Sequence, residues 1–189
     1  PSVAAAGLAR DLKAAGRDIV DLTVGEPDFD TLEHVREAAK AAIDTGQTRY
    51  TAVNGTPALR DAIAAAHKRA TGEDCPHPRI TVGGGGKQVI FLAFMASLDA
   101  GDEVIIPAPY WVSYPDMVLA NDGAPVIVPS SEAERFKISP AALERAITPR
   151  TKWLVLNLPG NPSGAAYSAG ELMAMAAVLR GHPHVRVMT

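Results

Sequence analysis

The chain has 189 residues, of which 47% are hydrophobic and 21% are charged, values that are ordinary for a folded globular protein and argue against disorder. Its net charge of -3 and its lack of a basic run argue against a nucleic-acid or membrane-surface partner. The single cysteine, Cys75, cannot form an internal disulfide, and no segment is long and apolar enough to span a bilayer. We therefore expect a globular protein from a reducing compartment, with the cytoplasm as its location.

The first part of the chain is predicted to be mainly helical. An alanine-rich helix is expected over 4–15, followed by a short extended candidate over 19–24. Thr31 is the expected N-cap of a second helix, which Gly46 ends. The pair Thr56–Pro57 has the N-cap and N1 signature of a third helix.

The rest of the chain alternates short apolar strands with helices. The expected strands are 80–82, 103–106, 125–128, 152–158 and 184–189, and the expected helices are 87–98, 111–120, 139–147 and 168–179. Ser139 and Ser168 are the expected N-caps of the last two helices. The strands lack polar alternation, as in a sheet covered on both faces. This order predicts an α/β fold, a three-layer α/β/α arrangement with a mostly parallel sheet.

The first candidate site is the run Gly83-Gly84-Gly85-Gly86-Lys87-Gln88, between an expected strand and an expected helix. Amides at a helix N-terminus suit a phosphate, and glycines let an anion approach the backbone closely. The run is not a P-loop, because Thr81 stands at the first glycine position and Gln88 stands where a Ser or Thr is needed. It also lacks the third glycine of a dinucleotide fingerprint. A plain flexible turn is the alternative.

Two further candidates follow strands, at the sheet edge where α/β proteins bind ligands. Trp111, at the end of Pro107–Trp111, can stack on a flat ligand, although structural packing is the commoner role of a tryptophan taken alone. Asn161, within Asn157–Gly164, can offer its amide to a ligand oxygen. A plain Asx-type turn is the alternative for Asn161.

Together, five blocks in this order resemble the signature of the aspartate aminotransferase family. The blocks are Val24-Gly25-Glu26-Pro27-Asp28-Phe29-Asp30-Thr31, Arg49-Tyr50-Thr51, Gly85-Gly86-Lys87-Gln88, Pro109-Tyr110-Trp111-Val112-Ser113-Tyr114-Pro115 and Asn161-Pro162-Ser163-Gly164. The resemblance covers essentially the whole chain and corresponds to the N-terminal half of the family's members. It implies an N-terminal arm and part of a small domain at 1–30, and an incomplete pyridoxal-phosphate-binding large domain at 31–189.

The resemblance also implies a cofactor, pyridoxal 5'-phosphate, and a homodimer with shared active sites. The implied reaction moves an amino group from an acidic amino acid to a 2-oxo acid. The implied cofactor-binding residues are Gly85, Gly86, Lys87, Trp111, Asn161 and Tyr50, the last reaching across the dimer. The implied substrate-binding residues are Gly25, Lys87, Trp111 and Asn161. Lys87 resembles the group that reads the substrate's distal carboxylate, and a solvated lysine on a first helical turn is the alternative.

No metal site and no catalytic residue is expected in this chain. By resemblance, the cofactor-anchoring lysine, the ring-nitrogen aspartate and the substrate-binding arginines belong to blocks after Thr189. Both ends of the chain look cut, so we expect a fragment that is inactive alone.

The chain departs from the family at three positions of these blocks. Leu32, Gly86 and Ser163 stand where the family usually has proline, alanine and threonine, and none of these changes removes a functional group. Two other functions stay open. One is the ligand-sensing domain of a transcription regulator, which would carry a DNA-binding domain upstream, and the other is a nucleotide-binding module, which the failed motifs disfavour.

Overall fold

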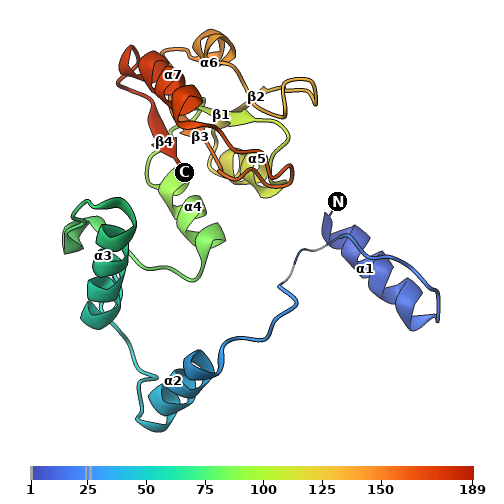
Figure 1. The fold of residues 1–189 in the computed structure, drawn as a ribbon, viewed down its shortest axis with the longest axis vertical. Coiled ribbons are helices and arrows are strands. Elements are labelled where there is room, and N and C mark those ends of the chain that lie inside the picture. The colour runs from blue at the N-terminus through green and yellow to red at the C-terminus, as the bar shows by residue number, and fades with distance from the viewer. Residues whose placement is uncertain (1, 24, 26) are drawn as a thin grey trace. The chain divides into compact units, whose positions relative to one another are not determined.

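The computed structural model describes residues 2–23, 25 and 27–189, and the chain forms two compact units, Pro1–Val82 and Gly83–Thr189 (Figure 1). The described part of the first unit contains only helices, whereas the second unit contains a sheet between helices. None of the helices in the described ranges is both long enough and apolar enough to cross a membrane. The domain boundary expected near residue 30 stays a prediction.

The first unit consists of α1 (Ser2–Ala14), α2 (Glu33–Asp44), α3 (Pro57–Thr71) and the short 3-10 helix η1 (His77–Arg79). α3 begins as predicted, because the Thr56 hydroxyl accepts a hydrogen bond from the Leu59 amide at 3.4 Å and Pro57 is the first helical residue. α2 ends as predicted, since Gly46 follows it with φ 74°, a conformation that glycine adopts without strain.

Two expectations for this unit are wrong. α2 has Leu32 rather than Thr31 as its N-cap, because the Leu32 carbonyl accepts the first helical hydrogen bonds. The segment 19–24 forms no strand over residues 19–23, and the sheet of the described chain contains no strand paired with it. Val24, at the end of that segment, lies outside the described residues.

Four parallel strands form the sheet of the second unit, in the order β2-β1-β3-β4. Their bounds are Glu103–Pro107 (β1), Ala124–Val128 (β2), Thr151–Val155 (β3) and Arg186–Met188 (β4). β1 pairs with β2 along its whole length, in register from Glu103 opposite Ala124 to Pro107 opposite Val128. The parallel sheet predicted from the strand–helix alternation is therefore confirmed.

Helices cover both faces of this sheet. The core on one side, under α4 (Gly86–Met95) and α5 (Ser113–Leu119), contains Phe94, Val104, Ile106 and Met117. The core on the other side, under α6 (Pro140–Ala146) and α7 (Ala169–Arg180), contains Ile105, Leu143, Leu154 and Met175. Alternate residues of β1 thus point into opposite cores, and the predicted three-layer architecture is confirmed.

Local capping signals in this unit are confirmed, but one predicted strand is wrong. The Ser139 hydroxyl accepts from the Ala142 amide at 3.1 Å, and Ser168 forms a reciprocal capping box with Glu171. The segment 80–82 just before this unit is not a strand. Its Val82 amide donates to the Asn54 carbonyl at 3.2 Å, and no strand of the described sheet pairs with it. A strand needs a partner strand, which local sequence cannot supply.

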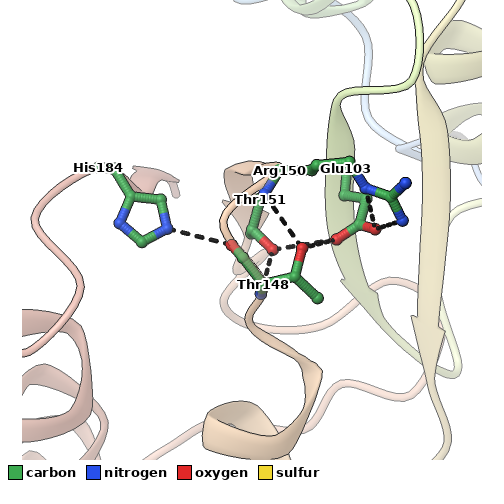
Figure 2. A network of polar contacts seen from close by, with 5 residues as sticks. All are labelled: Glu103, Thr148, Arg150, Thr151 and His184. Atoms are coloured by element: carbon green, nitrogen blue, oxygen red, sulfur yellow. Dashed lines mark hydrogen bonds and ion pairs between the residues drawn. The ribbon is translucent and has the colours of Figure 1, made fainter.

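A buried carboxylate ties together the amino ends of β1 and β3 (Figure 2). Glu103 is 5% exposed, and its Oε1 accepts two hydrogen bonds from the Arg150 guanidinium, at 2.7 and 3.1 Å. The hydroxyls of Thr148 and Thr151 donate to its Oε2. Burial raises the pKa of Glu103, but these hydrogen bonds and the Arg150 charge outweigh burial and hold the pKa below its ordinary value. This edge of the sheet is the one opposite to the candidate ligand-binding edge.

Candidate functional site

The candidate site lies at the carboxyl ends of β1 and β3. The segments that follow these two strands line one cavity of about 40 Å³, with Tyr110 from the first segment and Asn157 and Asn161 from the second. Parallel strands that share an edge bring their following loops together, and ligands of α/β sheets bind there. Two of the three candidate segments therefore meet as the sequence predicts.

The glycine run forms the N-terminus of α4. Gly85 is the N-cap and has φ 104°, in a region of conformation that favours glycine. No atom lies within 4 Å of the position that a Cβ would take at Gly85 or Gly86. The first-turn amides, which include those of Gly86 and Lys87, have no acceptor within the helix. An anion can therefore approach these amides closely, and the residues fit a phosphate group.

Lys87 and Trp111, predicted as separate candidates, lie together in the structure. The Lys87 Nζ is 5.2 Å from the centroid of the Trp111 ring, within the range of a cation–π contact. Trp111 is half-buried, and its ring is edge-on to Tyr114, with centroids 5.3 Å apart and planes at 88°. These contacts restrain the indole close to the glycine run.

The Lys87 side chain also borders an open groove. The groove has a volume of about 530 Å³, and Phe91 of α4 and Asp116 of α5 lie on its walls. Lys87 is exposed, so a carboxylate from solution can reach its ammonium. This exposure fits a lysine that reads an acidic ligand and fits the alternative of a solvated lysine equally, so the role of Lys87 stays a prediction.

Asn161 belongs to a turn that is closed by its own hydrogen bonds. The Asn161 backbone amide donates to the side-chain oxygen of Asn157 at 3.0 Å, and the Gly160 backbone amide donates to the Ala165 carbonyl at 2.8 Å. The Asx interaction predicted for this turn therefore uses the Asn157 side chain as acceptor. Asn161 is exposed, and its side-chain amide is available to a ligand on the same side of the sheet edge.

Gly25 and Tyr50 belong to the first unit. Both are exposed, and Gly25 lies in a segment without regular secondary structure. The structure describes the two units separately, so it does not relate these residues to Trp111 or Asn161. Their roles stay predictions.

Several residues on the cavity wall were not anticipated from the sequence. They are Tyr114, Phe136, Asn157 and Tyr167. Asn157 had a signal, because it precedes Asn161 by four residues within the same turn-forming block. Phe136 comes from the connection after β2, which begins at the same edge of the sheet, but no motif in that connection marks Phe136. Over residues 2–23, 25 and 27–189 there is no cluster of three or more His, Cys, Asp or Glu side chains suited to a metal ion.

Known proteins resemble this chain over its whole length. A family model described as aminotransferase class I and II matches residues 17–189. An aspartate/prephenate aminotransferase of Cereibacter sphaeroides is 53% identical over 188 residues, which are 100% of this chain and 47% of that protein. A protein of the same name from Nitrosomonas europaea is 51% identical over 189 residues, 48% of its length. The chain thus spans about half the length of the curated relatives it matches.

Solved structures give the same picture. The aspartate aminotransferase of Rhizobium meliloti superposes with a TM-score of 0.93 at 48% identity, over 98% of this chain and 46% of that one. The aspartate aminotransferase of Thermus thermophilus with maleate has a TM-score of 0.93 at 45% identity, over 98% of this chain and 49% of that one.

Proposed function

This chain belongs to the class I and II aminotransferases, and on that premise we propose that its protein transfers an amino group from an acidic amino acid to a 2-oxo acid, with pyridoxal 5'-phosphate as cofactor. The observation that carries the proposal is that one unit holds a helix N-terminus with open first-turn amides, a restrained indole and an exposed ammonium. This combination suits a ligand that has a phosphate, a flat ring and an acidic partner.

Each group in the chain has a binding role in this proposal. The amides of Gly85, Gly86 and Lys87 hold the cofactor phosphate, because first-turn amides carry partial positive charge. The Trp111 ring stacks on the pyridine ring, and the side-chain amide of Asn161 donates to the ring's phenolic oxygen. Gly25 contributes backbone contacts to the substrate's α-carboxylate, and Tyr50 reaches the cofactor phosphate of a partner subunit.

The bound cofactor supplies an electron sink, which makes the amino group mobile. This chain's residues bind and orient rather than transfer protons. Lys87 sits over Trp111 and is proposed to read a carboxylate, not to anchor the cofactor.

An acidic substrate is favoured by Lys87. Its exposed ammonium is a point charge on a flexible stem, which can meet a second carboxylate on the substrate. The relatives' names pair aspartate with prephenate, and each of these compounds carries a carboxylate besides the one on its α-carbon. We propose a dicarboxylic substrate of this kind, a homodimeric assembly and a cytoplasmic location.

Two measurements on the protein that contains this chain test the proposal. A visible absorbance band that differs from that of free pyridoxal phosphate and stays with the protein after the free cofactor is removed would support the cofactor and contradict a nucleotide-binding module. Transfer of the amino group from aspartate to a 2-oxo acid would separate an enzyme from a ligand-sensing domain. Cofactor binding without any transamination would overturn the proposed function.

A further inference from the structure

The proposed phosphate site depends on four consecutive glycines, Gly83–Gly86, which have no side chains to hold their own shape. A run of glycines has many accessible backbone conformations, so ordering it for binding costs conformational entropy. One neighbouring side chain restrains it. Gln88, the third residue of α4, accepts a hydrogen bond through its Oε1 from the Gly84 amide.

The same side chain covers one half of the run. A Cβ at Gly84 would lie 3.0 Å from the Gln88 Oε1, and a Cβ at Gly83 would lie 3.1 Å from that atom. At Gly85 and Gly86 no atom lies within 4 Å of the corresponding positions. Gln88 thus folds back over Gly84 and, together with a Val89 methyl that would lie 2.7 Å from a Cβ at Gly83, over Gly83, and it leaves the last two glycines open.

We propose that Gln88 is a positioning residue for anion binding by this loop, an inference that rests on the proposed function. By accepting from Gly84, it withdraws that amide from the ligand. It also holds the chain so that the amides of Gly85, Gly86 and Lys87 face one anion. A glutamine at the third helical position often reaches back to the N-cap amide in a capping box. Here it reaches one residue further, to the residue before the N-cap Gly85.

The neutrality of Gln88 is part of the argument. A glutamate at this position can accept the same hydrogen bond, but its charge would stand beside the bound anion and repel it. Two substitutions therefore separate the two properties. Gln88→Met removes the acceptor at similar length, and Gln88→Glu keeps the acceptor and adds the charge.

The test uses two probes that lack the aldehyde and so bind without a covalent bond, pyridoxine 5'-phosphate and pyridoxine. The ratio of their dissociation constants measures the contribution of the phosphate. We expect Gln88→Met to weaken pyridoxine 5'-phosphate about three- to tenfold, the effect of one hydrogen bond, and to leave pyridoxine unchanged. Gln88→Glu should weaken the phosphorylated probe at least as much.

A matched control is available at the start of α7. Glu171 is also the third residue of its helix and accepts from the Ser168 amide at 2.6 Å. Glu171→Met should destabilise that helix start and leave the ratio for the two probes unchanged. If Glu171→Met changes the ratio as much as Gln88→Met does, general destabilisation explains both results and the proposal is overturned.

A second readout reports on the loop itself. With glycine-selective ¹⁵N labelling, the Gly84 amide proton should move upfield in Gln88→Met, which loses the hydrogen bond, and should stay at or downfield of its original position in Gln88→Glu, which keeps it. An unmoved Gly84 signal in Gln88→Met, or an unchanged probe ratio in that variant, overturns the role of Gln88 alone. If the unaltered protein does not prefer pyridoxine 5'-phosphate over pyridoxine, the proposed cofactor site is itself wrong, and the inference fails with it.

Discussion

Lys87 is the residue on which we propose that substrate choice depends. Its Nζ lies 5.2 Å from the Trp111 centroid and borders an open groove, so its charge is near the proposed ring site and accessible. We expect Lys87→Ala to lower kcat/KM for aspartate and glutamate. The corresponding loss of transition-state binding free energy should be about 1.5–3 kcal/mol, the value of one charge-assisted contact. A neutral amino acid should lose far less.

The control for Lys87 is Lys40→Ala, which removes an exposed ammonium of α2 that pairs with Glu37 at 2.7 Å. Steady-state kinetics with acidic and neutral amino acids should show no change in that variant's preference. Equal losses for acidic and neutral substrates in Lys87→Ala would show that Lys87 does not read the distal carboxylate.

Arg135 carries backbone strain beside the cavity. It has φ 56° and Phe136, on the cavity wall, has φ 55°, a left-handed conformation that costs a residue with a Cβ. We expect Arg135→Gly to raise the free energy of unfolding by about 0.5–1 kcal/mol. Glycine relieves the strain in the folded state, and this gain exceeds the stabilisation of the unfolded chain by the added conformational entropy of glycine. Urea unfolding measures this change. Arg145→Gly, in the last turn of α6, should instead destabilise, and a loss in both variants would contradict the strain argument.

At the scale of elements, Glu103 connects β1 with the α6–β3 connection. Its carboxylate is buried, whereas the Arg150 side chain is 71% exposed. Solvent can therefore hydrate Arg150 after a Glu103→Gln substitution, so the loss of unfolding free energy should be smaller than for a fully buried ion pair. We expect Glu103→Gln to lower the free energy of unfolding by about 1–3 kcal/mol, because charge-assisted hydrogen bonds are lost, and urea unfolding measures this change. Glu37→Gln, in an exposed pair, should change stability by about 0.5 kcal/mol or less.

The same cluster predicts a pH dependence. The pKa of Glu103 is lowered in the folded state, so its stabilising contribution is complete above the unfolded-state pKa of about 4.3 and declines as pH falls below it. The stability difference between the unaltered protein and Glu103→Gln should therefore narrow from about pH 5 downward. Urea midpoints across this range check the sign. A difference that stays constant or widens in acid would rule out a stabilising ionised Glu103.

Elements also show what the sequence could predict. The starts of α3, α6 and α7 were predictable because Thr56, Ser139 and Ser168 bond to amides within the next three residues. The expected strand at 80–82 was wrong because strand formation depends on a partner far along the chain. The buried role of Glu103 was not predictable, since Thr148 and Arg150 are 45 and 47 residues away.

For the candidate site, the sequence marked Lys87, Trp111 and Asn161 as candidates, but it indicated neither their contacts nor the other residues of the cavity wall. Lys87 and Trp111 are 24 positions apart, and their contact arises because α4 and α5 cover the same face of the sheet. The wall position of Phe136 depends on the path of the connection after β2, which no motif marks.

At the scale of the whole molecule, apolar side chains remain exposed on α4. Val89, Leu92 and Met95 are 41%, 47% and 64% exposed. These three side chains recur every three residues along α4, and an apolar stripe of this kind is commonly covered by another chain or segment. We expect a polypeptide of residues 1–189 to associate at high concentration, and Leu92→Lys with Met95→Lys to reduce its light scattering. Unchanged scattering in the double variant would assign the association to another surface.

The last prediction concerns the activity of residues 1–189 as an isolated polypeptide. The first-turn amides of α4, the Trp111 ring and the side-chain amide of Asn161 are proposed to recognise a phosphate and a flat ring, so weak and non-covalent binding of pyridoxal phosphate is expected. Amino-group transfer also needs a covalent anchor and a group that moves a proton. Lys87 is proposed to serve neither purpose, because its ammonium lies over the Trp111 ring and is proposed to read a carboxylate instead. We therefore expect no transamination of aspartate with 2-oxoglutarate, even with added cofactor. Turnover above that of free pyridoxal phosphate, with contaminating aminotransferases excluded by mass spectrometry, would overturn this assignment and point to another amine within the chain.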